Sequence, residues 1–347
     1  MTLDERLDSF IRLGEILRQY PGTEEMEALN GLREAARTAV NKNGWFTPEH
    51  IAAALSAIGE SLQPMVLEKW IALYRNLMDD TSRTVGVVMA GNIPAVGFHD
   101  FLCVLISGNR LNAKLASGDS ELLPAISRIL VSFNPEWNEY ITFTNGRLET
   151  FDAIIATGSN NSSQYFEFYF KTYPHIIRRH RNSVAILMGT ETALELERLA
   201  DDVFLYFGMG CRNVSKIFVP YDFDFNRLPA AFRKYNHFCN HNKYRNNYDY
   251  MKSIFLINKV PFLDTGSLLI TADKAISSPI SVLHYEHYNK ITDVAGVLAK
   301  AADEIQCVVA ATDPGIPFVL PGQTQSPALW EYADGIDTMK FLMEGKS

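Results

Sequence analysis

The 347-residue chain has few cysteines, no excess of basic residues and no long apolar run. Its four cysteines are scattered with no C-x-x-C spacing, which argues against a secreted disulfide framework and favours a reducing cytosol. The net charge of −8 argues against a nucleic-acid surface, which would show a basic face. The apolar runs are too short to cross a bilayer, and the N-terminus lacks the pattern of a signal peptide. We therefore expect a cytoplasmic protein with no membrane span and no nucleic-acid partner.

What the chain does contain is typical of a globular protein. Hydrophobic residues make up 47%, which excludes a disordered or fibrous chain, and the length suits two domains or one large α/β unit. Residues 1–80 show helical spacing, broken near residues 41–44 and 63–64. Strand, turn and helix then alternate three times, which predicts a parallel sheet with crossover helices. The three predicted pairs are 85–90 with 96–106, 110–116 with 121–133, and 151–159 with 162–171.

The second half repeats this pattern less regularly, and we place its boundary near residues 181–182. The stretch 237–250, HFCNHNKYRNNYDY, is rich in Asn and aromatics and is not assigned. Helices are predicted at 193–208 and 290–302. Strands are predicted at 183–189, 215–223, 253–259, 267–273, 280–286 and 305–312.

Cys211 is the candidate nucleophile. It follows two glycines in Gly208-Met209-Gly210-Cys211-Arg212-Asn213, between a predicted helix and a predicted strand. Glycines at this spacing indicate a turn where the backbone can approach a ligand closely. The alternative is a small buried apolar residue, which is the usual role of a free cysteine. Cys103, Cys239 and Cys307 are interpreted as packing residues.

Three further positions follow predicted strands of the first half. Asn92, in Gly91-Asn92-Ile93-Pro94, could donate its amide to a developing oxyanion, or it could be a turn-former and helix cap. Gly158 and Ser159 open a helix, whose free N–H groups attract phosphate, although a plain capped helix is the alternative. Lys114 could hold a ribose or phosphate, or it could be a solvated charge.

Two polar clusters are weighed against simpler explanations. If residues 237–241 form a strand, His237, Cys239 and His241 would share one face and could bind zinc. The stretch resembles a loop and no fourth ligand stands nearby, so polar loop contacts are favoured and no metal site is predicted. The basic run 178–181 is interpreted as a solvated turn, with contact to coenzyme A phosphates as the alternative.

The order of these segments resembles the aldehyde dehydrogenase superfamily. It is more closely similar to the acyl-CoA reductases related to the reductase subunit of the bacterial luminescence fatty-acid reductase complex. The matching segments run from about residue 84 to 342 and include AGNIPAVGFHD, NAKLASGDS, ATGSNNSSQYFEFYF, YPHIIRRHRNSVAIL, FGMGCRNVSKIFVP and YADGIDTMKFL.

The resemblance implies an α/β, aldehyde-dehydrogenase-like fold. Its expected parts are a helical N-terminal segment (1–80), a Rossmann-type cofactor domain (81–181) and an α/β catalytic domain with the nucleophilic cysteine (182–322). A C-terminal segment (323–347) would return to the cofactor domain or make an oligomer contact.

The resemblance also assigns roles to the candidate residues. Cys211 matches the nucleophile and Asn92 the amide that holds the oxyanion. Lys114 matches the lysine that contacts the adenosine ribose or its phosphate. Gly158 and Ser159 match the Gly-Ser pair beside the pyrophosphate.

Departures from the family pattern refine the expected chemistry. Hydrolytic relatives carry a glutamate that activates water, and Ile177 stands at that position here, with no Asp or Glu between Glu167 and Glu191. Acyl transfer with coenzyme A is therefore favoured over acid formation. His175 is the nearest titratable group that could assist catalysis, and a structural role for it is the alternative.

Two more departures concern the cofactor. Ser117 stands where NAD-preferring relatives often carry a glutamate, which favours NADPH, with NAD as the alternative. Ala275 stands where the family has a glutamate that grips the nicotinamide ribose, which puts tight nicotinamide placement in question.

The expected activity is NADPH-dependent reduction of an acyl-CoA thioester, of the fatty acyl class, to the aldehyde through an acyl-cysteine. One alternative is an aldehyde dehydrogenase working in the oxidative direction, with or without coenzyme A. Another is a non-redox acyl-thioester binder. The resemblance further implies an acyl-CoA or acyl-enzyme donor, an acyl-transferring partner protein and a homo-oligomer.

Overall fold

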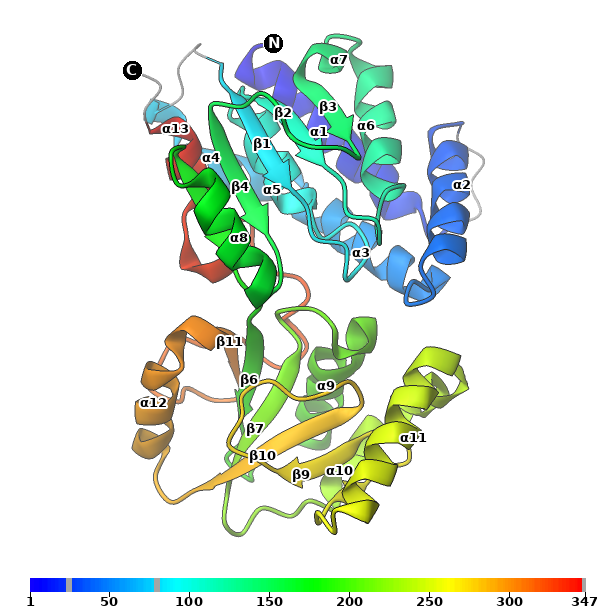
Figure 1. Cartoon of the computed structure of the whole chain (residues 1–347), viewed down its shortest axis with the longest axis vertical. Coiled ribbons are helices and arrows are strands. Elements are labelled where there is room, and N and C mark those ends of the chain that lie inside the picture. Colours follow the sequence, from blue (N-terminus) through cyan, green and yellow to red (C-terminus); the bar gives the residue numbers. More distant parts are fainter. Residues whose placement is uncertain (23–26, 78–81, 345–347) are drawn as a thin grey trace. The chain divides into compact units, whose positions relative to one another are not determined.

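The computed structural model describes residues 1–22, 27–77 and 82–344 (Figure 1). The chain divides into two compact units, Met1–Arg179 with Ala328–Ser347, and His180–Pro327. The second unit is thus an insertion between two segments of the first. Within the described ranges, no helix is both long and apolar enough to cross a membrane.

The N-terminal region is helical, as predicted, and its helices break at the predicted places. Its first helix begins with a capping box, in which Thr2 and Glu5 satisfy each other's backbone N–H groups. Large side chains such as Phe10 and Trp70 are fully buried and join the core of the first unit. Burying each such side chain stabilises the fold by about 2–3 kcal/mol. The elements are α1 (Leu3–Gln19), α2 (Glu27–Lys42), α3 (Pro48–Ser61), α4 (Pro64–Ala72) and a 3-10 turn at Arg75–Leu77.

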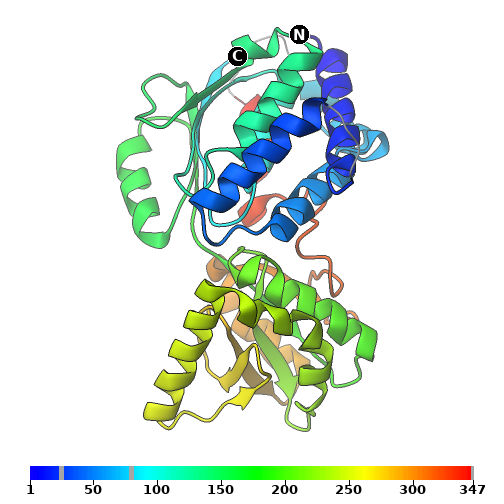
Figure 2. The ribbon, with the colours of Figure 1, turned by 90° about the vertical axis from the view of Figure 1, so that its right-hand side faces the viewer.

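Among the described residues of the first unit, five parallel strands form one sheet in the order β3-β2-β1-β4-β5. This is a doubly wound order, which reverses direction between β1 and β4. Helix α8 covers one side of the sheet, and α6 and the N-terminal helices lie on the other side (Figure 2). The strands are β1 (Thr84–Val88), β2 (Arg110–Lys114), β3 (Ile141–Thr144), β4 (Ala153–Thr157) and β5 (His175–Arg178). The helices are α5 (Phe98–Ile106), α6 (Leu122–Phe133), α7 (Trp137–Tyr140) and α8 (Asn160–Phe170).

The three predicted strand–helix pairs of the first half are confirmed as β1 with α5, β2 with α6 and β4 with α8. Strands β3 and β5 were not predicted. Both are four residues long and lie at the two edges of the sheet. Such short segments lack the continuous apolar run that marks a central parallel strand.

The second unit, all of whose residues are described, contains a six-stranded sheet in the order β11-β6-β7-β10-β9-β8. Every pairing is parallel except that of β8 with β9. The strands are β6 (Asn182–Ile186), β7 (Val214–Pro220), β8 (Leu263–Asp264), β9 (Leu269–Ala272), β10 (Val282–Tyr288) and β11 (Ile305–Ala310). The α-helices are α9 (Ala193–Phe204), α10 (Arg227–Phe232), α11 (Asn242–Ile257) and α12 (Ile291–Lys300).

One strand prediction in this unit is wrong. Residues 253–259 were expected to form a strand, but most of them belong to α11. The buried residues of this helix, Tyr244, Tyr248 and Phe255, are four and seven positions apart, which is helical spacing. The unassigned stretch 237–250 is the end of a 3-10 helix (Arg233–Asn240) followed by the start of α11.

The C-terminal segment belongs to the first unit and packs against its helices. Tyr332 accepts a hydrogen bond from the indole of Trp70 at 2.7 Å and donates to the hydroxyl of Tyr74 at 2.8 Å. Its elements are a 3-10 turn (Ala333–Gly335) and α13 (Thr338–Met343), and α13 contacts α5.

The solvated-turn interpretation of the basic run 178–181 is wrong for Arg178, the last residue of β5. Arg178 is buried, forms an ion pair with Asp100 at 2.5 Å and donates to Thr338 at 2.8 Å. Arg179 and His180 are exposed, as expected for such a turn. Arg178 is buried because it belongs to a strand of the sheet. The run of basic residues in the sequence does not show this.

Candidate active site

Five of the predicted site residues lie at one edge of the first unit's sheet. Val88, the last residue of β1, is in register with Lys114 of β2 and Ala156 of β4, so these strands end in line. Asn92 follows β1, Ser117 follows β2, and Gly158 and Ser159 follow β4. Doubly wound sheets bind ligands at the carboxyl ends of the strands, where the strand order reverses.

The loop that carries Asn92 is fixed by the loop after β2. A Cβ added to Gly91 would lie 2.6 Å from the Cβ of Ala116, and one added to Gly118 would lie 2.6 Å from the carbonyl oxygen of Gly91. The carboxylate of Asp119 accepts the backbone N–H of Ala95 at 2.7 Å. The two loops can approach this closely only because both glycines lack a side chain.

Asp119 is a residue that the sequence analysis did not single out. It is buried, and burial raises its pKa to about 6 even though three backbone N–H groups, those of Ala95, Leu122 and Glu121, lower it. Ala95, its main partner, has a positive φ of 53°. A strained backbone held by a buried carboxylate is typical of a functional loop. The only sequence signal was an Asp in the turn-forming Ser117-Gly118-Asp119-Ser120.

At the end of β4, Gly158 and Ser159 have local structural roles. The Ser159 hydroxyl caps α8 by accepting the N–H of Ser162 at 3.2 Å. A Cβ on Gly158 would lie 2.8 Å from the ring of Phe166, so glycine allows the helix to pack close to the strand. The helix-cap interpretation is therefore confirmed for Ser159, and a phosphate contact at this helix start stays a prediction.

Lys114 and Ser117 remain accessible at this edge. Lys114 is half-buried, and among the described residues its ammonium has no hydrogen-bond or ion-pair partner. Ser117 is exposed. A half-buried cation at the end of a strand can therefore bind an anionic group of a ligand without first losing a protein partner.

His175 lies at the opposite end of the same sheet. It is the first residue of β5 and pairs with Ile154 near the start of β4, three positions before the carboxyl end at Thr157. Its ring contacts the carbonyl oxygen of Tyr173 at 2.8 Å and lies 3.9 Å from Glu167. Three residues of strand span about 10 Å. The structure therefore does not bring His175 to the edge that carries Asn92 and Lys114.

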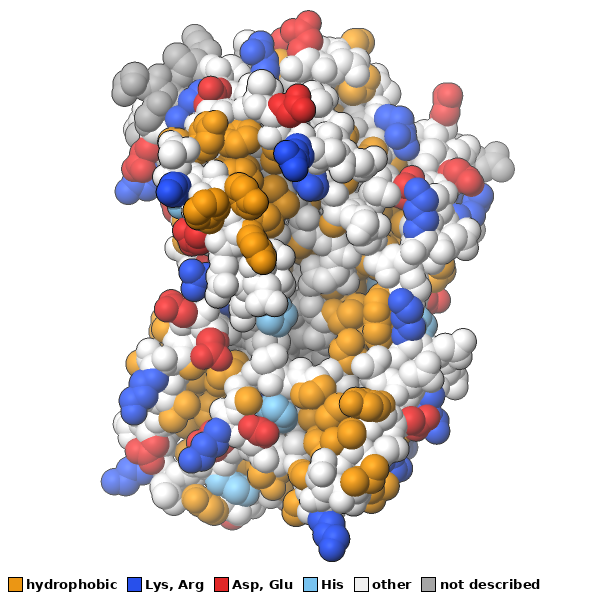
Figure 3. All heavy atoms as spheres, in the orientation of Figure 1, with side chains coloured by type: hydrophobic (Ala, Val, Ile, Leu, Met, Phe, Trp, Pro, Cys, Tyr) orange, Lys and Arg blue, Asp and Glu red, His pale blue; other side chains and the backbone are white. Residues whose placement is uncertain are grey.

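The outer face of α8 is unusually apolar. In this helix, which is fully described, the single buried residue is Ser163. Tyr165, Phe168 and Tyr169 in this helix, and Tyr173 just after its end, are 42–67% exposed. Figure 3 shows hydrophobic side chains gathered over this helix. We refer to these four residues as the α8 aromatic face.

In the second unit, Cys211 lies in a tight turn between α9 and β7. The turn spans Gly210–Asn213 and is closed by the Asn213 N–H, which donates to the Gly210 carbonyl at 3.0 Å. Asn213 is 1% exposed, accepts the Gly210 N–H at 2.8 Å, and donates to the carbonyl oxygens of Asp202 and Leu205, both at 2.9 Å. One buried amide thus joins the Cys211 turn to the end of α9. Cys211 itself is half-exposed.

The backbone just before this turn is strained. Tyr206 and Phe207 have φ values of 57°, and Gly208 follows at 74°. A left-handed conformation costs a non-glycine residue about 1–2 kcal/mol. The helix predicted over 193–208 therefore ends at Phe204, and the chain turns sharply into the Cys211 turn. Strain next to a half-exposed, firmly held cysteine supports a functional role for it.

The loop around Ala275 is anchored through its own backbone, because the Ala275 N–H donates to the carboxylate of Asp273 at 2.8 Å. The carbonyl oxygen of Ala275 lies 3.1 Å from Nδ1 of His284. Next to it, the fully buried Lys216 donates to the carbonyl oxygen of Lys274 at 2.8 Å and pairs with Glu286 at 2.6 Å. The loop is therefore ordered even though Ala275 has no carboxylate to offer a ribose.

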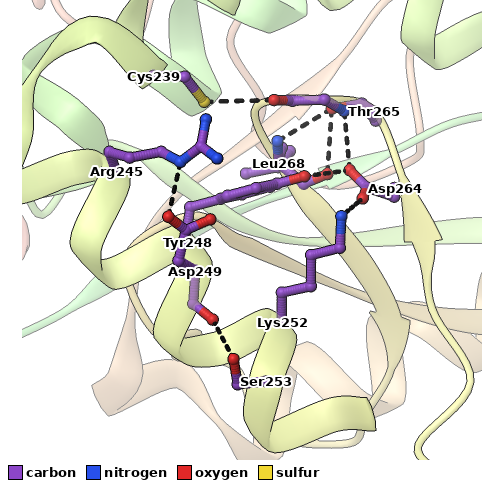
Figure 4. Close-up of polar contacts among 10 residues, drawn as sticks. Cys239, Arg245, Tyr248, Asp249, Lys252, Ser253, Asp264, Thr265 and Leu268 are labelled. Atoms are coloured by element: carbon purple, nitrogen blue, oxygen red, sulfur yellow. Dashed lines mark hydrogen bonds and ion pairs between the residues drawn. The ribbon is translucent and has the colours of Figure 1, made fainter.

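The strand needed for zinc binding at 237–241 is absent, because these residues form the end of a 3-10 helix and its cap. The thiol of Cys239 donates to the carbonyl oxygen of Gly266 at 3.2 Å, in a network that also holds Asp264 through Tyr248 and Lys252 (Figure 4). Over the ranges that the structure describes, no three His, Cys, Asp or Glu residues are placed to hold a metal ion.

Several solved structures share this architecture. The indole-3-acetaldehyde dehydrogenase of P. syringae, in complex with NAD⁺ and IAA, is 11% identical with a TM-score of 0.64, covering 89% of this chain and 72% of its own. Aldehyde dehydrogenase 21 of Physcomitrella patens, in complex with the reaction product succinate, is 13% identical with a TM-score of 0.65, covering 99% and 84%. Staphylococcus aureus AldH is 16% identical with a TM-score of 0.56, covering 89% and 76%. No family model and no curated protein sequence matches the chain.

These similarities show that the fold is aldehyde-dehydrogenase-like and of the α/β class. At 11–16% identity they show the fold alone. Asn92 belongs to the first unit and Cys211 to the second.

Proposed function

We propose that this chain is an NAD(P)-dependent oxidoreductase of the aldehyde group, and specifically an acyl-CoA reductase that converts a fatty acyl thioester to the aldehyde. The observation that carries the proposal is Cys211, half-exposed in a turn held by a buried amide and preceded by strained backbone. The shared fold supports it, because several neighbours are described as aldehyde dehydrogenases and some are complexes with NAD⁺.

In the proposed first step, the sulfur of Cys211 attacks the thioester carbonyl carbon. The bond to the coenzyme A sulfur breaks, coenzyme A leaves as its thiol, and an acyl-cysteine remains. Asn92 is the proposed amide donor to the oxyanion of this step. Because Ile177 stands where hydrolytic relatives have a glutamate, we expect this acyl-cysteine to react slowly with water.

The residues at the carboxyl edge of the first unit's sheet fit a nicotinamide dinucleotide. Lys114 offers an unpaired ammonium among the described residues, and the start of α8 offers backbone N–H groups beside Gly158 and Ser159. Because Ser117 is exposed and neutral, it leaves room for a 2′-phosphate, which favours NADPH over NADH. When bound, the reduced cofactor supplies the hydride that the aldehyde product requires.

The test is covalent labelling. After incubation with a long-chain acyl-CoA, mass spectrometry of the intact protein should show one acyl group, and peptide mapping should place it on Cys211. The Cys211→Ala variant should not be labelled, whereas Cys239→Ser, which removes another half-buried thiol, should be labelled like the wild type. Labelling that persists in Cys211→Ala would refute the proposal.

A panel of acyl chain lengths, with NADPH consumption as the readout, would then define the substrate.

Two alternative functions make different predictions. An enzyme working in the oxidative direction would oxidise aldehydes with NAD(P). Assays with and without free coenzyme A would distinguish a coenzyme A-dependent aldehyde dehydrogenase from a coenzyme A-independent one. A non-redox acyl-thioester binder would be acylated but would not bind NADPH at millimolar concentration, which the missing carboxylate at Ala275 makes worth measuring.

We also propose that the chain forms a homo-oligomer through the α8 aromatic face. Four aromatic side chains at 42–67% exposure present roughly 400–600 Å² of largely apolar surface. A standard interface buries about 800 Å² per partner, so this face would supply about half or more of one side. Glu167 and Arg179, which form an ion pair at 3.7 Å, and Lys171 flank it with charges of both signs, which is compatible with a self-complementary surface.

A further inference from the structure

Two cysteines of the second unit share a hydrogen-bond partner. Ser183 in β6 is fully buried, and its hydroxyl donates to the carbonyl oxygen of Cys211 at 3.2 Å. The same hydroxyl oxygen lies 3.0 Å from the sulfur of Cys307. The sulfur of Cys307 therefore lies within two hydrogen-bond lengths of the Cys211 backbone.

Both cysteines occupy irregular positions beside the same strand. Strand β6 lies between β7 and β11. Cys211 lies in the turn just before β7, and Cys307 lies where the register of β11 against β6 shifts, between Ile305 and Val308. Such irregularities re-aim a side chain away from the regular ladder. Both cysteines are half-exposed, although Ser183 between them is not.

The electrostatics of Cys307 also connect the two residues. Burial raises the pKa of the Cys307 thiol, and the Ser183 hydroxyl and the charge of Arg212 lower it in part. A negative charge on Cys211 raises it further, so the charge state of one thiol affects the other.

We propose that Cys211 and Cys307 form a reversible disulfide when the protein meets a peroxide. Hydrogen peroxide transfers one oxygen to the Cys211 sulfur, which gives a sulfenic acid and one water. The Cys307 sulfur then attacks the Cys211 sulfur, the S–O bond breaks, and a second water leaves as the S–S bond forms. In total the two thiols lose two electrons and the peroxide gains them.

This inference rests on the proposed function in one respect, because it takes Cys211 as the reactive thiol. A disulfide needs Cα atoms within about 7 Å. Cys211 lies in a turn outside the ladder, so closing the bond requires this turn, which the Asn213 amide otherwise holds, to open while the paired strands stay in place. The bond would block the nucleophile and also protect it from irreversible oxidation to sulfinic acid.

The experiment uses the full-length protein and hydrogen peroxide as the probe. After peroxide treatment, free thiols are alkylated and the protein is digested without reduction for mass spectrometry. We expect two of the four thiols to be lost per chain, a peptide linking Cys211 to Cys307, and full recovery of both thiols with a dithiol reductant. The control Cys239→Ser should form the same link.

The Cys307→Ser variant should form no link, and its Cys211 should instead gain two or three oxygens irreversibly. The inference is overturned if wild-type Cys211 is over-oxidised as fast as in this variant and no linked peptide is found. Acylation without peroxide tests the proposed function separately. A chain that is acylated but not linked refutes this inference alone, and a chain that is linked but never acylated refutes the function alone.

Discussion

The carboxylate of Asp119 holds the backbone N–H of Ala95 at 2.7 Å, and this contact ties the loop after β2 to the loop that carries Asn92. The aspartate is buried, so its ionisation affects both the stability of the first unit and the geometry of one candidate catalytic loop.

Because burial raises the pKa of Asp119 to about 6, the folded chain binds this proton more tightly than the unfolded chain does. The stabilisation from Asp119 is therefore complete below about pH 4 and is lost as the pH rises through about 6, by up to about 3 kcal/mol. We expect the difference in free energy of unfolding between wild type and Asp119→Asn to fall across this window in urea titrations. Burial also raises the pKa of Asp202 to about 6. Because Asp202 is present in both proteins, its contribution to the pH dependence of stability cancels in this difference. A difference that is constant from pH 4 to 7 would contradict the prediction.

Asn213 should position Cys211 without being chemically involved. Asn213→Ala would leave the N–H of Gly210 and the carbonyl oxygens of Asp202 and Leu205 without their partner, at a cost of about 2–4 kcal/mol in the free energy of unfolding. We expect acylation of Cys211 by acyl-CoA to slow about tenfold or more, because orientation is lost. Alkylation by iodoacetamide, which needs only an accessible thiol, should not slow. Equal slowing of both reactions would instead indicate a general loss of the fold.

Ser117 should determine the choice of cofactor. In Ser117→Glu, the new carboxylate would repel a 2′-phosphate, so the affinity for NADPH should fall about tenfold or more while that for NADH changes little. Lys114→Met should weaken both nucleotides, and the exposed Lys300→Met is the control that should change neither. Nucleotide fluorescence titration measures all three variants. Equal losses for both nucleotides in Ser117→Glu would rule out a role for this position in specificity.

The α8 aromatic face can be tested by polar substitution. Phe168→Ser combined with Tyr169→Ser removes two side chains that are each 67% exposed, so the folded monomer should lose little stability. We expect the molar mass from light scattering to fall to that of one chain. Leu256→Ser in α11, where the leucine is 62% exposed, is the matched control. An unchanged molar mass in the double variant would contradict an oligomer through this face.

His175 should be dispensable for acylation. It lies at the start of β5 and contacts Tyr173 and Glu167, at the end of the sheet opposite to Lys114. We expect His175→Gln to be acylated within about twofold of the wild-type rate, with the same dependence on pH. A large loss accompanied by an altered pH profile would instead assign His175 a catalytic role.

Local sequence patterns were sufficient to predict the helical N-terminus and the strand–helix pairs that place Asn92, Lys114 and Gly158. They failed where long-range contacts decide the structure. Nothing local shows that Arg178 pairs with Asp100, 78 residues away. The short apolar run at 253–259 also suggested a strand, although Tyr244, Tyr248 and Phe255 follow the spacing of a helix that begins at Asn242. The turn glycines pointed to Cys211, but the buried Asn213 that holds its turn is identified only by its distant partners.

The insertion of the second unit has a consequence for how the protein is made. On the ribosome, residues up to Arg179 emerge well before Ala328–Ser347, the segment that completes the first unit. Until then, Trp70 lacks Tyr332 and the buried guanidinium of Arg178 lacks Thr338. The second unit is continuous from His180 to Pro327 and needs no later segment. We therefore expect the second unit to finish folding before the first. The first unit can complete its fold only after the last part of the chain has been synthesised.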